Sequence, residues 1–121
     1  MIEIIQDFPQ DVAAFNATGK VTADDYNTTI NPLVRKIKQQ SGKIKYMLVL
    51  NTSLSNYTIG AWIKDGLLGL KYFTRWSKIA IVAKEKRIVN FTNFFGKLLP
   101  AATKGFLMKD INSARHWISG S

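Results

Sequence analysis

The chain has 121 residues, a formal net charge of +9, one histidine and no cysteine. A chain of this length forms one domain, here residues 1–121, that buries about two-thirds of the surface its unfolded form exposes. The lack of cysteine excludes disulfides, thiolate zinc sites and a cysteine nucleophile, and a single histidine argues against a nitrogen-rich metal site. We therefore expect neither a metal site nor a cofactor.

Sixteen of the 17 lysines and arginines follow residue 34, together with three of the eight acids. A basic surplus attracts nucleic-acid phosphates or anionic lipid headgroups, and charge that serves solubility alone is the alternative. No nucleic-acid-reading motif accompanies the bases, so we do not expect a nucleic-acid partner. The chain lacks a run of about 20 apolar residues and a signal-peptide start, which favours a soluble, cytoplasmic protein.

Residues 2–5 and 12–17 have the composition of two short strands, and the turn residues around Pro9 favour a hairpin between them. Thr22 is then expected to cap a helix, with Asp25 in the capping-box position three residues later. This interpretation assigns the carboxylate of Asp25 and its acidic neighbour to the start of a helix rather than to a catalytic dyad.

The helix that follows this cap carries an apolar stripe at spacings of three and four residues and ends at Gly42. Pro32 lies inside it, where a proline ring removes a backbone hydrogen bond and clashes with the preceding turn. We therefore predict a kink or a broken first segment near residues 29–31.

Nearly continuous apolar runs at residues 44–50 and 79–82 flank a span of helical periodicity at residues 58–76. Two such runs around an amphipathic helix predict a βαβ unit, whose strands are parallel and covered by the helix. The polar loop at residues 51–57 lies at the carboxyl end of the central strand. Ligands and switches tend to lie at this edge of open parallel sheets.

Residues 88–99 predict another amphipathic helix, which Pro100 ends. The residues expected on its apolar face are Ile88, Phe91, Phe94, Phe95, Leu98 and Leu99. Its phenylalanines belong either to the core or to a helix that lies in a membrane interface. A short strand at residues 106–108 and a helix from Asp110 follow, so the predicted order is β-β-α-β-α-β-α-β-α.

His116 is the one candidate general base at neutral pH. Ser113 lies about one helical turn before it, but no acid is placed to orient such a pair. Gly66 and Gly69 fall inside a predicted helix and lack the lysine that a phosphate-binding loop requires. We therefore predict a non-enzymatic protein without catalytic residues, in which His116 is structural or solvated.

Several stretches of the chain carry a resemblance to a known family. They are Met1-Ile-Glu-Ile-Ile5, Gly19-Lys-Val-Thr-Ala-Asp-Asp-Tyr26, and Gly60-Ala-Trp-Ile-Lys-Asp-Gly-Leu-Leu-Gly-Leu-Lys71 running into Trp76-Ser-Lys-Ile-Ala-Ile-Val82. Together with the order of the elements, they resemble the SpoIIAA-like group of STAS-related proteins over nearly the whole chain. The pattern is specific to this group but contains no catalytic signature.

The resemblance implies an α/β fold, a β-α superhelix with a mixed, mostly parallel sheet of about five strands and about four helices. This fold is shared by anti-sigma-factor antagonists and by lipid-carrying CRAL/TRIO domains. In the antagonists, the serine of an aspartate–serine pair at the start of the second helix is phosphorylated and switches partner binding. Residues 55–60 match that region with hydroxyls at Ser55 and Thr58 but lack the aspartate–serine pair.

On this basis we expect a bacterial binding module for a lipid or another apolar small molecule, or one that associates with an anionic membrane. The residues expected to line an apolar groove between the second and third helices are Trp62, Leu67, Phe91, Phe94 and Phe95. A basic patch, defined as Lys84, Lys86 and Arg87, would meet an anionic headgroup or an acidic partner.

The competing hypothesis is a regulatory module of the anti-sigma-factor-antagonist type that engages a protein partner. Its interaction loop would span residues 51–58 and include Ser55, Tyr57 and Thr58. Both hypotheses leave open whether the protein forms a homodimer.

Overall fold

The computed structural model of the protein describes residues 1–19, 25–51, 76–97 and 101–120. Its strands are β1 (Ile2–Ile4), β2 (Val12–Thr18), β3 (Ile44–Asn51), β4 (Trp76–Ala83) and β5 (Ala102–Leu107). Its helices are the π-helix η1 (Tyr26–Ile30), α2 (Asn31–Ser41), α4 (Lys86–Gly96), the 3₁₀-helix η5 (Met108–Asp110) and α5 (Ile111–Ser119). None of the helices in these ranges is long and apolar enough to cross a membrane.

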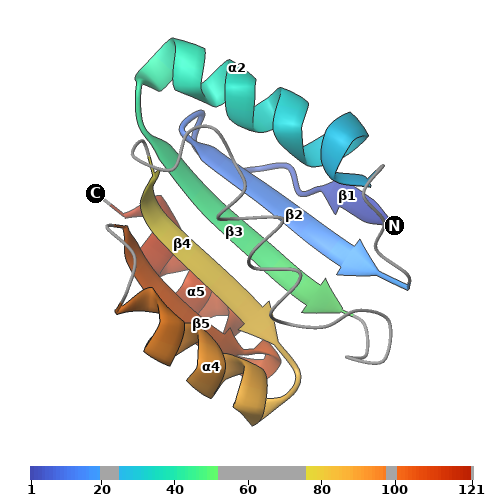
Figure 1. Cartoon of the computed structure of the whole chain (residues 1–121), viewed down its shortest axis with the longest axis vertical. Helices are drawn as coiled ribbons and strands as arrows, with labels where there is room; N and C mark the ends of the chain where they lie inside the picture. Colours follow the sequence, from blue (N-terminus) through green and yellow to red (C-terminus); the bar gives the residue numbers. More distant parts are fainter. Residues whose placement is uncertain (20–24, 52–75, 98–100, 121) are drawn as a thin grey trace.

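The five strands form one sheet in the order β1-β2-β3-β4-β5 (Figure 1). Strand β1 runs antiparallel to β2, with Ile2 opposite Ala17, which confirms the predicted hairpin. Strands β2, β3, β4 and β5 are each parallel to the next. The sheet is therefore mixed and mostly parallel, and the predicted α/β class is confirmed.

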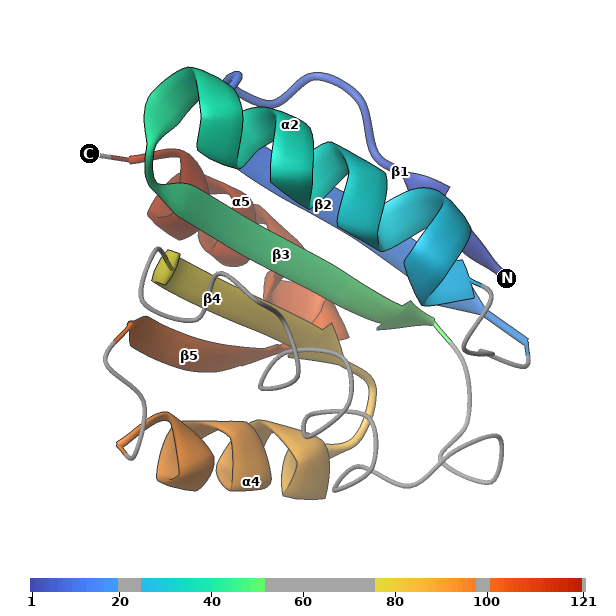
Figure 2. The same cartoon turned by 45° about the horizontal axis from the view of Figure 1, so that its top comes forward.

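Helices α2 and α4 cover one face of the sheet and α5 covers the other (Figure 2). The core on the first face includes Val34 and Ile37 of α2 and Ile88 of α4. The core on the second face includes Ala114 and Ile118 of α5. Because the parallel strands follow one another in chain order, right-handed crossovers place the helices that connect them on one face. Helix α5 follows the last strand, so this constraint does not apply to it.

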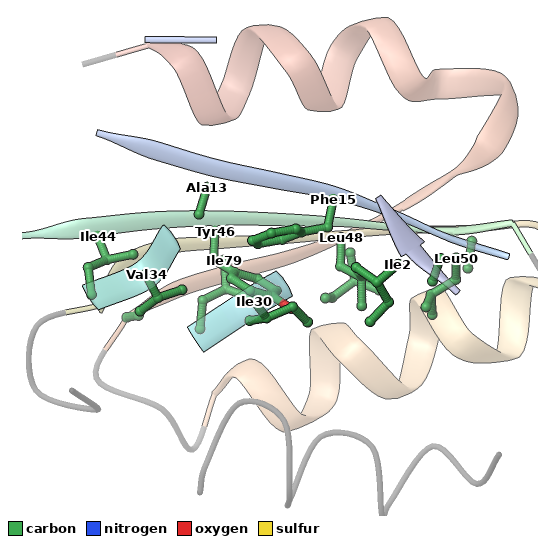
Figure 3. Close-up of a cluster of buried hydrophobic side chains, with 14 of the residues drawn as sticks. Ile2, Ala13, Phe15, Ile30, Val34, Ile44, Tyr46, Leu48, Leu50 and Ile79 are labelled. Atoms are coloured by element: carbon green, nitrogen blue, oxygen red, sulfur yellow. The ribbon is translucent and has the colours of Figure 1, made fainter. Parts of the chain in front are cut away.

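Strand β3 lies at the centre of the sheet and contributes side chains to both cores. Figure 3 shows its alternate residues on one side of the sheet, namely Ile44, Tyr46, Leu48 and Leu50. Phe15 of β2 packs against Tyr46, with ring centroids 5.6 Å apart. The intervening residues Met47 and Val49 belong to the core beneath α5. Because both faces are covered, β3 is an almost unbroken apolar run, as the sequence predicts.

The predicted irregularity before Pro32 is confirmed. A π-helical turn at Tyr26–Ile30 runs directly into α2, and Pro32 is the second residue of α2. Because proline has no N–H to donate to the preceding turn, the regular α-helical hydrogen bonding is altered there. Gly42 ends the helix as predicted, because it adopts a φ of 76° and its N–H donates to the Lys38 carbonyl at 2.9 Å. The predicted cap at Thr22 lies outside the described residues.

The structure corrects the predicted end of the helix at residues 58–76. Trp76 belongs to β4, where its backbone pairs with Ile44 of β3. The remainder of that predicted helix lies outside the described residues. A single aromatic residue between two predicted elements fits both the helical and the strand spacing of apolar residues. Here the parallel backbone pairing with β3 makes Trp76 a strand residue.

The last strand is longer than the sequence predicts. Strand β5 begins at Ala102 rather than at residue 106, and its first residue pairs with Lys78 of β4. Pairing with β4 holds Lys104 and Gly105 in extended backbone, although neither residue favours strands by itself. The sequence therefore reveals only the apolar end of β5.

Candidate functional site

Helix α4 packs on the edge of the sheet formed by β4 and β5. Its inward side chains include Ile88 and Thr92, each 2% exposed. The Thr92 hydroxyl donates to the Ile88 carbonyl at 2.8 Å, so this buried polar group is satisfied within the helix. The helix spans Lys86–Gly96, so it ends before the predicted end at residue 99.

Two glycines bring α4 unusually close to β5. A Cβ atom at Gly105 would lie 2.8 Å from the carbonyl oxygen of Val89, and one at Gly96 would lie 2.7 Å from Cβ of Thr103. A glycine inside a strand often marks such a close backbone approach. The Gly105 N–H also donates to Oδ1 of Asn93 at 2.8 Å, which ties the helix to the strand. Helix α4 therefore meets β5 along the side that carries Val89.

This contact turns Phe94 outward and corrects the predicted apolar face. Phe94 is 66% exposed and lies on the side of the helix away from Ile88 and Thr92. Other exposed residues lie on the same side of the helix as Phe94. We call this set the α4 outer stripe; it consists of Arg87, Asn90, Phe94 and Lys97. The spacing of apolar residues defines a wide face, but the closest contact with the sheet decides which part of that face is buried.

The basic patch of Lys84, Lys86 and Arg87 is exposed at the amino end of α4. Nε of Arg87 lies 3.0 Å from Oε2 of Glu85, and such an exposed pair contributes at most about 1 kcal/mol. No acidic residue occupies the first turn of α4, and the partial positive charge of a helix amino terminus disfavours cations there. The fold therefore gathers excess positive charge beside the α4 outer stripe.

The other predicted groove and loop residues are not placed by the structure. Phe91 and Phe95 belong to α4, and their side chains are not among those described. The predicted residues outside the described ranges are Trp62 and Leu67 of the groove, and Ser55, Tyr57 and Thr58 of the interaction loop. The groove and the loop stay predictions, whereas the basic patch and Phe94 are brought together on one helix.

His116 lies exposed on α5, and no hydrogen bond joins its ring to Ser113. No group of three or more side chains that could hold a metal ion occurs in the part of the chain that the structure describes. Among the side chains that the structure describes, the α4 surface offers cationic hydrogen-bond donors and the exposed ring of Phe94. This chemistry binds anionic and amphipathic groups.

Comparison with known proteins relates the whole arrangement to one family. The SpoIIAA-like family profile matches residues 12–119, from the start of β2 to the end of α5. A crystal structure of an uncharacterized protein of the DUF3478 family from Shewanella loihica PV-4, with a SpoIIAA-like fold, is similar to this chain. The two are 26% identical over 97% of this chain and 93% of the other, with a TM-score of 0.63. A search of curated proteins found no sequence that matches.

Proposed function

This chain belongs to the SpoIIAA-like family, and we propose that it is a non-enzymatic binding module that attaches to anionic membrane surfaces through α4. The observation that carries the proposal is the exposed Phe94 ring on a helix whose amino end bears the basic patch. An apolar ring flanked by cations suits an interface in which acyl chains lie beneath anionic headgroups.

The exposed groups allow a rough estimate of the strength of this attachment. Full burial of a phenylalanine side chain contributes about 1.5–3 kcal/mol, and about two-thirds of Phe94 is available for burial. Each net positive charge near an anionic leaflet adds about 1 kcal/mol, and the four bases of the basic patch and Lys97, less the charge of Glu85, supply a net of three. The total of about 4–5 kcal/mol corresponds to a dissociation constant of about 0.2–1 mM. The attachment is therefore weak, reversible and weakened by salt.

A lipid held in a groove lined by Trp62, Leu67, Phe91 and Phe95 is the other form of this proposal. We favour the surface because the exposed Phe94 ring lies on the helix that carries the basic patch, so one surface offers both an apolar ring and cations. The competing proposal is a protein-interaction module that acts through residues 51–58. Replacement of Ser55 and Thr58 by alanine would then reduce partner capture and leave vesicle binding unchanged.

The test is co-sedimentation of the protein with phosphatidylcholine vesicles that do or do not contain phosphatidylserine. We expect binding to the anionic vesicles only, with a decrease when salt is raised. The double variant Lys86→Glu/Arg87→Glu should bind at least about tenfold less, because two favourable charges become repulsive. Phe94→Ala should bind about fivefold less, since it loses the exposed ring.

A matched control is available on α2. Arg35 and Lys36 are also adjacent exposed bases, so Arg35→Glu/Lys36→Glu changes the net charge by the same amount on another helix. We expect this control to retain vesicle binding within about twofold. Equal losses for the two charge reversals would show that net charge alone governs binding, and the assignment to α4 would then be wrong.

A further inference from the structure

A cavity of about 290 Å³ that is open to solvent lies between α5 and the loop that joins β1 to β2. Its lining residues are Asp7, Phe8, Asn112, Arg115, His116 and Ser119. Helix α5 packs on the face of the sheet opposite α2 and α4 (Figure 2), so the cavity is separate from the α4 outer stripe. At about 30 Å³ per water molecule, the cavity has room for on the order of ten waters. A small organic molecule occupies a similar volume.

One wall of the cavity is a row of polar side chains on α5. Successive members of this row are three, one and three residues apart, which places them on one side of the helix. They are Asn112, Arg115, His116 and Ser119. The buried side of α5 is formed instead by Ala114 and Ile118. These four polar residues therefore present hydrogen-bonding groups along a single wall.

The opposite wall is the β1–β2 loop, which hydrogen bonds hold at both ends. The Ile5 N–H donates to the Ala14 carbonyl at 2.9 Å, and the Val12 N–H donates to the Pro9 carbonyl at 3.0 Å. Phe8 packs against the core beneath α5. The loop therefore forms a preorganised rim, which lowers the entropic cost of holding a ligand there.

Arg115 is positioned by the ring of Phe8. Its guanidinium carbon lies 4.7 Å from the ring centroid, a distance at which a cation is attracted to an aromatic face. Among the described residues, no carboxylate forms an ion pair with Arg115. A guanidinium group that stacks on a ring keeps its planar N–H donors for a carboxylate.

Asp7 supplies the opposite charge in the same cavity. It is exposed, and within the described ranges it has no cationic partner within 4.0 Å, Arg115 included. An acid and a base thus line one cavity without pairing with each other. A ligand that carries both charges would satisfy both groups, whereas a ligand with one charge would satisfy only one.

We infer that this cavity binds a small zwitterion, a molecule with a carboxylate and an ammonium group on a short chain. Its carboxylate accepts hydrogen bonds from Arg115, and its ammonium group donates to the carboxylate of Asp7. Asn112, His116 and Ser119 lie along the same wall to bond further polar atoms of the ligand. The inference does not depend on the proposed membrane attachment, because it uses residues on the other face of the sheet.

The test is a titration of the ¹⁵N-labelled protein, followed by amide chemical shifts, with β-alanine, 4-aminobutyrate and 6-aminohexanoate. We expect at least one of these zwitterions to cause saturable shifts at residues 6–8 and 112–119. Butyrate and n-butylamine, each with one of the two charges, should bind at least about tenfold more weakly. No saturable shift with any of the three zwitterions at millimolar concentrations would overturn the inference.

Two variants separate the charges. Asp7→Asn and Arg115→Gln should each weaken zwitterion binding at least about tenfold. Asparagine accepts the φ of 69° that Asp7 adopts, so the loop geometry is retained. The matched controls Glu3→Gln and Lys109→Gln remove an exposed acid and an exposed base outside the cavity, and should bind as the unmodified protein does. Equal weakening by a control and its cavity variant would also overturn the inference.

Discussion

The replacement Gly105→Ala tests whether close packing between α4 and β5 sets the orientation of α4. Gly105 does not have a positive φ, so alanine suits its backbone. Replacing a glycine within a strand by alanine ordinarily stabilises a protein by about 0.5–1 kcal/mol. Here the added Cβ would lie 2.8 Å from the Val89 carbonyl oxygen and 3.0 Å from Val89 Cα. We therefore expect a change of the opposite sign.

The magnitude follows from what the new atom meets. The obstacle at Val89 is helix backbone rather than the end of a flexible side chain, so α4 must move as a unit by several tenths of an ångström. Overpacking of this kind costs about 1–3 kcal/mol. After subtraction of the backbone gain, the free energy of unfolding should fall by about 1–2 kcal/mol. For a chain of this size, the midpoint of thermal unfolding should fall by about 3–8 °C.

Urea unfolding followed by circular dichroism measures this change directly. The control is Ala102→Ser at the exposed first position of β5, which should stay within about 0.5 kcal/mol of the unmodified protein. An unchanged dependence on urea would show that both variants unfold from equally compact states. If Gly105→Ala is as stable as the unmodified protein or more stable, the close approach does not constrain α4 and the reasoning is refuted.

Two further predictions concern other contacts. Nζ of Lys78 donates to the carbonyls of Trp117 and Gly120 at 2.9 and 3.2 Å, so Lys78→Met should lower the free energy of unfolding by about 1–3 kcal/mol in urea denaturation. A loss below about 0.5 kcal/mol would mean that these bonds do not hold the end of α5. Phe94→Ala should change stability by less than about 0.5 kcal/mol in the same assay, because the ring is already exposed. Ile88→Ala, on the buried side of the same helix, should lower the free energy of unfolding by about 2–4 kcal/mol. If Phe94→Ala and Ile88→Ala lowered it equally, the orientation of α4 would be contradicted.

Much of the fold follows from local signals. The apolar run that became β3 indicates a strand buried on both faces, because alternation disappears when helices cover a sheet on each side. Pro32 marks the irregular turn before α2 and Gly42 marks the end of α2 through their own backbone preferences, and both act as predicted. Such signals are readable because their physical cause lies within a few residues.

The misplaced elements have causes that lie elsewhere in the chain. Phe94 is outward because Gly105, on another element, admits α4 along its Val89 side. Trp76 is a strand residue because β3 offers it a backbone partner at Ile44. Neither cause appears in the periodicity of the segment concerned. For the orientation of Phe94, the one local signal was Gly105 beside a short apolar run, and a glycine there has several possible explanations.

The sequence alone determined the class of the fold, the position of its central strand and the presence of a basic cluster at residues 84–87. These properties depend on composition and on spacing along the chain. Only the tertiary structure decided that Phe94 stands among exposed cations, and that Asp7 and Arg115 line one cavity without forming an ion pair. The cavity arises where elements distant in the chain pack together, whereas Phe94 is turned outward by the packing of α4 on β5. Packing depends on side-chain volume and backbone approach in three dimensions.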